Sequence, residues 1–184
     1  MLTLHKGTGV RVSSKEDCPL DPGHALLVNG DRLAEVGPYD ELYERYGARA
    51  RVREWAGELT PGRYEPDAGA WLEAAYHPDP REAAELGDEP LTGAALAALE
   101  MTDTRWGASA RRGLQRLMAC GTTAMSGHFS RGTVRIAVER SRIRVLSAPR
   151  ERALLPSGAA DFAVRTEDGG CLATVLGGRI VHRR

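Results

Sequence analysis

Two histidines and one aspartate are the side chains whose positions best suit acid–base or metal chemistry. His128 directly follows TTAMSG, which indicates a short buried strand. We therefore expect His128 at that strand's C-terminal end, where α/β folds build their sites. Asp67 lies in RYEPDAG and His77 in AAYHPDPRE. If Asp67, His77 and His128 meet at one mouth, they could transfer protons or bind a metal ion, so they are the candidate catalytic residues.

A structural interpretation competes with this catalytic one. The three candidates are then solvated loop side chains, and Asp79 only caps a helix that Pro80 begins. The remaining histidines, His5, His24 and His182, fall on predicted strands or their turns. There we expect half-exposed residues without a chemical role.

Nucleophilic catalysis has less support than acid–base chemistry. Cys120 precedes Gly121 at the end of a predicted helix, where the helix dipole disfavours a thiolate and a buried apolar role is expected. Ser126 lacks the G-x-S-x-G elbow of hydrolase nucleophiles. The three cysteines are widely spaced and include no CxxC pair, which argues against a disulfide framework or a structural zinc site and suits a reducing cytoplasm.

Charge and hydropathy exclude several classes of partner. The 25 basic residues balance the 25 acidic ones, so there is no overall field that would attract nucleic acid or an anionic membrane. No apolar run approaches the ~18 residues of a membrane span, and the N-terminus lacks a secretory apolar core. We expect a cytoplasmic protein that binds neither nucleic acid nor membrane. The Arg-, Ala- and Gly-rich composition is typical of bacteria with GC-rich genomes.

The N-terminal part of the chain is predicted to be mainly β structure. LTLHK and VRVSS are separated by Gly-Thr-Gly, and ALLV meets DRLAEVG across Asn29–Gly30, the strongest two-residue hairpin signal. PYDELYERYG shows helical spacing of its apolar residues, and ARVREW alternates as a strand does.

The middle of the chain is predicted to be mainly helical. Helices are expected over 92–101 and 102–121, the second with Thr102 or Asp103 as N-cap and Gly121 as its stop. TTAMS is a predicted strand, Ser130 is expected to cap a helix over 131–140, and IRVLS is a further strand. DFAVRT, CLATVL and RIVHR return the C-terminus to β structure. The fold class is therefore α+β, with one sheet system built from both chain ends.

Several motifs together resemble the amidohydrolase superfamily. These are GHALLVNGDRLAEVGPYDEL, LTPG, RRGLQRLMACGTTAM and GAADFAVRTEDGGCLATVLGGRIVHRR, which occur in the family's order and spacing. The group around imidazolonepropionase and aminodeoxyfutalosine deaminase is the most similar. The resemblance implies a composite β-sandwich formed by residues 1–58 plus 158–184, with a barrel between them. A full barrel needs ~200 or more residues, so residues 59–157 are expected to form only a vestigial βα insert.

The resemblance also implies a metal site that this sequence does not preserve. Family members place two histidines in an HxH motif after LTPG, where they hold zinc or iron. The corresponding positions here are Asp67 and Gly69. Glycine has no donor side chain, and one carboxylate does not replace the roughly three protein ligands of a catalytic metal. We expect no metal and no other cofactor.

These observations favour a degenerate amidohydrolase-like protein that acts by binding or assembly without catalysis. The alternative is a hydrolase of non-peptide C–N bonds, such as a deaminase or imidazolonepropionase-like enzyme, with a rebuilt or partner-shared site. The resemblance would then imply menaquinone or histidine metabolism. A carrier of a small-molecule ligand is a third class. An unfinished barrel would expose a strand edge and an apolar face, so a homodimer through the insert is expected unless segment 74–103 covers them.

Overall fold

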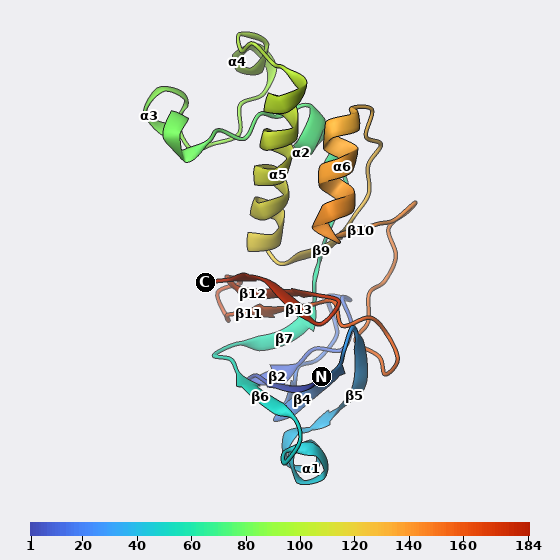
Figure 1. Cartoon of the computed structure of the whole chain (residues 1–184). Coiled ribbons are helices and arrows are strands. Elements are labelled where there is room, and N and C mark those ends of the chain that lie inside the picture. Colours follow the sequence, from blue (N-terminus) through green and yellow to red (C-terminus); the bar gives the residue numbers. More distant parts are fainter. The chain divides into compact units, whose positions relative to one another are not determined.

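Strands from both ends of the chain pair in one sheet of this computed structural model, which describes residues 1–184. The six strands run in the order β13 (Arg179–Arg183), β12 (Cys171–Leu176), β11 (Phe162–Arg165), β7 (Glu58–Pro61), β2 (Gly9–Val10) and β3 (Asp21–Pro22). The junction between the two chain ends is the antiparallel pair β11–β7, in which Phe162 lies opposite Pro61. The expected pairing of both ends in one sheet is therefore present (Figure 1).

A second sheet is built from the N-terminal residues alone. Its order is β5 (Arg32–Pro38), β4 (His24–Asn29), β1 (Leu2–Lys6) and β6 (Arg51–Glu54). The predicted hairpin joins β4 to β5, and Gly30 in its turn has a φ of 62°, which glycine adopts without a steric cost. Helix α1 (Tyr39–Tyr46) follows β5 directly.

The two sheets pack through a shared apolar core. Along β4 the side chains alternate between faces, as strand geometry requires. Leu26 and Val28 join Leu59 and Phe162 of the six-stranded sheet in one cluster. Ala25 and Leu27 lie in a separate cluster with Leu4 and with Leu42 of α1. Burial of both faces explains why ALLV is continuously apolar.

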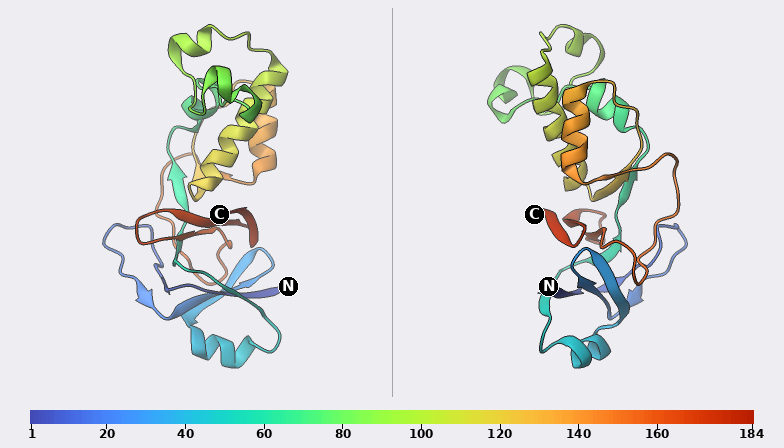
Figure 2. Two further views of the ribbon diagram at one scale, coloured as in Figure 1. Left: turned by 90° about the vertical axis from the view of Figure 1, so that its left-hand side faces the viewer. Right: turned by 45° about the vertical axis from the view of Figure 1, so that its right-hand side comes forward.

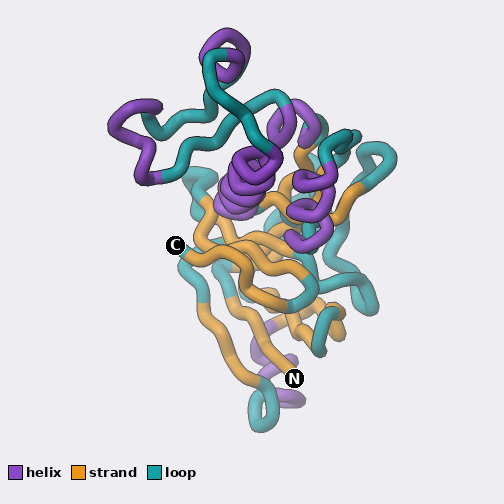
Figure 3. The backbone as a smooth tube through the Cα atoms, turned by 45° about the horizontal axis from the view of Figure 1, so that its top comes forward, coloured by secondary structure: helices purple, strands orange, loops and turns teal.

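The chain divides into two compact units. Unit 1 comprises Met1–Arg63, Met118–Thr123 and Arg150–Arg184, and unit 2 comprises Tyr64–Leu117 and Ala124–Pro149. Strands predominate in unit 1 and helices in unit 2, as the colours of Figure 3 show. The fold is therefore of mixed α+β class, with several sheets and no closed barrel.

A short sheet and a set of helices make up the middle of the chain. The strands are ordered β10 (Arg144–Val145), β9 (Thr122–Met125) and β8 (Arg63–Glu65), and β9 and β10 are parallel. The helices are α2 (Ala68–Glu73), the 3-10 turn η1 (Pro80–Glu82), α3 (Ala83–Leu86), α4 (Gly93–Ala97), α5 (Asp103–Ala119) and α6 (Gly132–Ser141). Figures 1 and 2 show α5 and α6 side by side, and a Cβ at Gly107 of α5 would lie 3.2 Å from Cβ of Thr133.

Helix boundaries follow the sequence signals in most places. The Thr102 hydroxyl accepts the Arg105 N–H at the start of α5, and Gly121 after it has a φ of 85°. The apolar side of α5 is buried, as helical periodicity predicts. Ser130 does not cap α6, because its hydroxyl donates to Glu73 and Arg131 occupies the cap position. The helix expected over 92–101 shortens to α4, and no helix is both long and apolar enough to cross a bilayer.

Segment 76–82 folds onto α5 through a network of charged and polar side chains. Arg105 donates to the Tyr76 hydroxyl at 3.1 Å and forms an ion pair with Glu82 at 2.9 Å. Arg112 pairs with Asp79 at 3.4 Å. Asp79 and Glu82 form a capping box around η1, with Pro80 at its first position, so Asp79 has the predicted capping role. Arg105 and Arg112 therefore hold part of segment 74–103 against α5.

Candidate functional site

Asp67 follows β8 after one residue, Pro66, and is the N-cap of α2. Its Oδ1 accepts the N–H of Ala70 at 3.1 Å, and its own N–H donates to Oε1 of Glu65 at 3.1 Å. Aspartate is strongly preferred at a helix N-cap because its carboxylate accepts an otherwise unpaired helix N–H. One oxygen of Asp67 is thus already occupied by the backbone of its own helix.

The residue two positions later, Gly69, faces the segment that follows β9. A Cβ built on Gly69 would lie 3.3 Å from the carbonyl oxygen of His128 and 3.8 Å from its backbone nitrogen. The same Cβ would lie 3.9 Å from Oδ1 of Asp67. The structure therefore brings Asp67 and the exposed His128 to neighbouring segments, one after β8 and one after β9.

His77 lies in the interior of unit 2. The residue has no solvent-exposed surface, so it is not the solvated loop side chain of the structural interpretation. Its ring packs on Trp71 at 4.8 Å between centroids, and its backbone N–H donates to the Ser109 hydroxyl at 2.9 Å. A Cβ on Gly113 of α5 would lie 2.6 Å from Nε2 of His77. The missing side chain at position 113 therefore makes room for the His77 ring.

The protonation state of His77 follows from these contacts. Nε2 lies 2.8 Å from the carbonyl oxygen of Trp71, which only accepts, so Nε2 carries the hydrogen. Nδ1 is buried and has no hydrogen-bond partner. Burial is the main cause that lowers the pKa of His77, and the charges of Arg116 and Arg112 lower it further. His77 is therefore a neutral packing residue whose one free nitrogen is sealed from solvent.

Glu73 ties the end of α2 to the start of α6. Its Oε2 accepts from the N–H and the hydroxyl of Ser130 at 3.0 and 2.7 Å, and its Oε1 accepts from the N–H of Arg131 at 2.7 Å. Burial acts to raise the pKa of Glu73, but these hydrogen bonds to the ionised form outweigh it and the pKa is lowered. A carboxylate with this many donors serves the backbone and is not a poised general base.

These donors do not fit the zinc or iron ion that the family resemblance implies. Asp67 caps a helix, Gly69 has no donor, and Nε2 of His77 binds a backbone carbonyl. No group of three or more histidine, cysteine, aspartate or glutamate side chains has a metal-binding arrangement. A catalytic metal needs about three protein ligands, so no chemical step can be assigned to a metal in this chain.

Solved hydrolases share this fold. The chain matches A. niger ochratoxinase with a TM-score of 0.52 and 17% identity over 78% of this chain and 30% of that one. It matches E. coli guanine deaminase with a TM-score of 0.51 and 14% identity over 79% and 35%. It matches an amidohydrolase with a TM-score of 0.50 and 17% identity over 79% and 30%. No family model and no curated protein matches the sequence.

The likeness extends to the fold alone. The chain spans about a third of the length of these structures, 30% to 35% in the three matches. Their identities of 14% to 17% carry no inference about shared substrates. The resemblance read from the sequence motifs is thus supported at the level of architecture.

Sequence patterns did not reveal the structural roles of Glu73 and Gly113. Glu73 bonds residues 57 and 58 positions away, and Gly113 accommodates a ring 36 positions earlier. The one local signal was a glycine in the middle of a strongly helical segment, where glycine costs about 1 kcal/mol relative to alanine and therefore has a packing reason.

Proposed function

We propose that this chain is a degenerate amidohydrolase-like protein that acts by binding or assembly and not by metal-dependent hydrolysis. Its two-sheet unit then corresponds to the composite β-sandwich of the superfamily, and residues 59–157 to a partial barrel. The proposal is supported by the shared fold and by the residues that stand where the superfamily places its first metal ligands.

The contact between Gly69 and His128 carries the proposal. A side chain at position 69 would need to extend into space that the backbone of His128 already limits, at 3.3 Å from Cβ. The carboxylate of Asp67, two residues before Gly69, accepts a hydrogen bond from the N-terminus of α2. The local structure is therefore organised around a helix cap and a close backbone approach, where a metal enzyme would organise it around ligands.

The experiment is a metal and activity analysis of the purified chain. We expect elemental analysis to find far less than one zinc, iron or manganese ion per chain. We also expect no release of ammonia from aminopurine, adenosine or imidazolone substrates after zinc or iron is added. E. coli guanine deaminase, purified in the same way, provides the positive control for the ammonia-release assay. A stoichiometric metal together with turnover would overturn the proposal.

A second candidate function rests on the proximity of Asp67 and His128. A carboxylate and an exposed imidazole on neighbouring segments are a pair suited to general acid–base catalysis. The alternative is thus a hydrolase of non-peptide C–N bonds whose site is rebuilt around these two residues or completed by a partner. This alternative would be established if the metal-free wild-type protein turns over a substrate and both Asp67→Asn and His128→Gln lower that turnover.

Assembly is the other part of the proposal. Strands β8 and β10 are the outer strands of their three-stranded sheet, and the large exposed apolar side chains of unit 2 are Ile136 and Val145. An open strand edge beside exposed apolar groups favours pairing with a second chain. We propose a homodimer through the insert as the form in which the protein binds a small-molecule ligand or another partner.

A further inference from the structure

Unit 1 contains a cleft whose lining is strongly basic. Its volume is about 190 Å3, below the roughly 300–1,000 Å3 of pockets for drug-sized ligands, so it suits a small ion or a single functional group. The charged residues that line it are Arg11, Lys15, Glu58, Arg63, Arg152 and Arg165. Five cations and one carboxylate thus face one cleft of a chain whose overall net charge is zero.

Some of this charge is neutralised within the protein. Arg11 forms an ion pair with Glu58 at 3.0 Å, and Lys15 forms one with Glu151 at 3.4 Å. Arg63 and Arg165 take part in no ion pair; Arg165 donates to the carbonyl oxygen of Gly169 at 2.5 Å. Two guanidinium groups in the lining therefore lack a countercharge.

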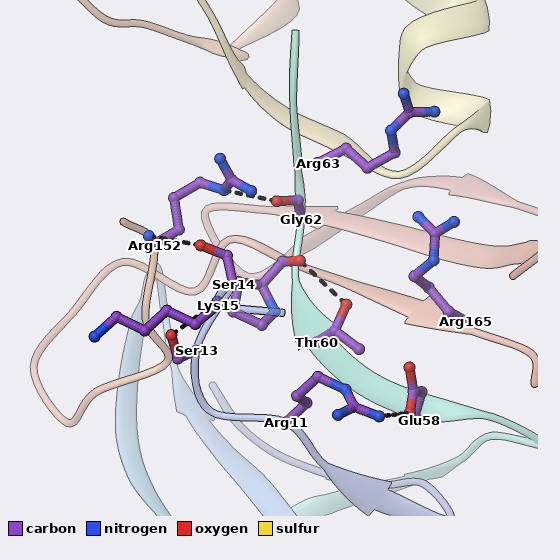
Figure 4. Close-up of a pocket in the computed structure, with 11 residues that line it drawn as sticks. Arg11, Ser13, Ser14, Lys15, Glu58, Thr60, Gly62, Arg63, Arg152 and Arg165 are labelled. Atoms are coloured by element: carbon purple, nitrogen blue, oxygen red, sulfur yellow. Dashed lines mark hydrogen bonds and ion pairs between the residues drawn. The ribbon is translucent and has the colours of Figure 1, made fainter. Parts of the chain in front are cut away.

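Arg63 and Arg165 come from different strands, and each lies beside Gly121. The Arg63 N–H donates to the carbonyl oxygen of Gly121 at 2.8 Å, and a Cβ on Gly121 would lie 3.6 Å from Nη1 of Arg165. Figure 4 shows Arg63 extending from the start of β8 and Arg165 from the end of β11. In the β7–β11 pairing Arg165 lies opposite Glu58, which precedes Arg63 by five residues along the same stretch of chain.

The rim of the cleft also carries an uncharged hydrogen-bond donor, the Ser14 hydroxyl. The Ser14 hydroxyl accepts the Arg152 N–H at 3.0 Å, which leaves its own hydrogen for a ligand. Nε of Arg152 donates to the carbonyl oxygen of Gly62 at 2.8 Å and fixes the direction of that guanidinium (Figure 4). The chain at Gly62 is itself tightly packed, since a Cβ there would lie 2.2 Å from Cγ2 of Thr123.

We infer that this cleft binds a small oxyanion with two or more negative charges, such as a phosphate group or a polycarboxylate. Guanidinium groups present paired N–H donors that match the oxygens of phosphate and carboxylate groups. Such a ligand supplies the countercharge that Arg63 and Arg165 lack, and a small cleft favours it over a bulky one. The inference depends on unit 1 alone, so it holds whether or not the chain hydrolyses a substrate.

The test is calorimetric titration of the full chain with inorganic phosphate at mildly alkaline pH and constant ionic strength. We expect saturable binding of one phosphate per chain. Arg63→Gln and Arg165→Gln should each weaken it about tenfold or more, the loss expected when one charge-assisted hydrogen bond is removed. Arg179→Gln is the matched control, because Arg179 is exposed on β13 of the same unit and lies outside the cleft. It should change the affinity by less than about twofold, since distant exposed charges are screened.

Further titrations separate the sources of the ligand and the outcomes. If phosphate binds more tightly than citrate, the ligand is a phosphoryl group. If citrate binds more tightly than phosphate, the ligand is a polycarboxylate. Either result supports the inference. Equal binding of acetate and phosphate would overturn it, because the cleft would then act only as diffuse positive charge. The inference is also overturned if Arg63→Gln, a substitution at an exposed position, leaves phosphate binding unchanged. It is likewise overturned if Arg179→Gln weakens phosphate binding as much as Arg63→Gln does. Circular dichroism of each variant checks that the fold is retained.

Discussion

Gly69 packs directly against the backbone of His128, whose carbonyl oxygen would lie 3.3 Å from a Cβ at position 69. A contact this close is tighter than ordinary van der Waals packing, so even alanine requires the His128 segment to shift slightly. The close approach of the segments after β8 and β9 therefore makes use of the missing side chain at position 69.

Introducing a histidine pair like that of the amidohydrolase superfamily at positions 67 and 69 should not create a metal site. We expect the Asp67→His/Gly69→His double variant to bind zinc with less than one ion per chain, because the remaining ligands are missing. It should also lose about 1–3 kcal/mol of unfolding free energy through overpacking at position 69 and loss of the α2 cap. Zinc titration and urea denaturation measure the two effects. Asp67→His alone separates the lost cap from the overpacking, and stoichiometric zinc in the double variant would contradict the prediction.

Gly113→Ala should destabilise the protein although alanine favours helices. Its Cβ would lie 2.6 Å from Nε2 of His77 and 2.8 Å from Cδ2 of Leu72. Overpacking of this kind costs about 1–3 kcal/mol, more than the roughly 1 kcal/mol that the better helix propensity returns. His77→Ala should remove much of this clash, so the double variant should lose less stability than the sum of the two single variants. Additive losses in urea denaturation would show that the ring and the glycine are not coupled.

The unfolding free energy should fall in acid because His5 is buried in the neutral form. Burial, and then the charge of Arg53, lowers the pKa of His5 from 6.5 to about 4. The stability contributed is fully present above pH 6.5 and is lost as the pH falls towards about 4, since only the unfolded chain takes up the proton. At 1.36 kcal/mol per pH unit the loss from this residue is about 3 kcal/mol.

Substitution of His5 tests this assignment. Nδ1 of His5 accepts the indole N–H of Trp55 at 3.2 Å, and the amide oxygen of an asparagine can also accept it. His5→Asn should therefore reduce the pH dependence of the unfolding free energy in this range by about one proton. His24→Asn is the control, because His24 is only half-buried. Parallel stability curves for wild type and His5→Asn would refute the prediction.

Self-association through the insert is a prediction that solution measurements decide. We expect light scattering to give twice the chain mass of 19.9 kDa at tens-of-micromolar concentration. Ile136→Glu and Val145→Glu should shift the protein towards monomer, because a buried charge at an interface without a partner is costly. Tyr43→Glu, at an equally exposed apolar position of unit 1, should not. A wild-type mass of 19.9 kDa would mean that the insert needs no second chain.

Local sequence signals predicted the elements whose causes are local. The Asn29–Gly30 turn, the Thr102 cap and the Asp79–Pro80 start of η1 each depend on residues within a few positions, and all three are present. The pairing of both chain ends in one sheet was also expected, because β patterns flank a helical middle. Asp67 and Gly69 after LTPG differ from the histidine pair that the resemblance implies, and the sequence alone showed this difference.

Only the tertiary structure decided which polar residues are buried and which distant ones meet. The sequence suggested half-exposed strand or loop positions for His5 and His77, yet both are buried, because segments far away in the chain close over them. Gly113 makes room for His77, and Phe162 packs on His5 with 5.0 Å between ring centroids. The basic cleft likewise joins Arg63 to Arg165 across 102 positions of sequence, through strand pairing that no local pattern encodes. Turns and caps are set by a few bonds nearby, whereas burial is a property of the whole packed chain.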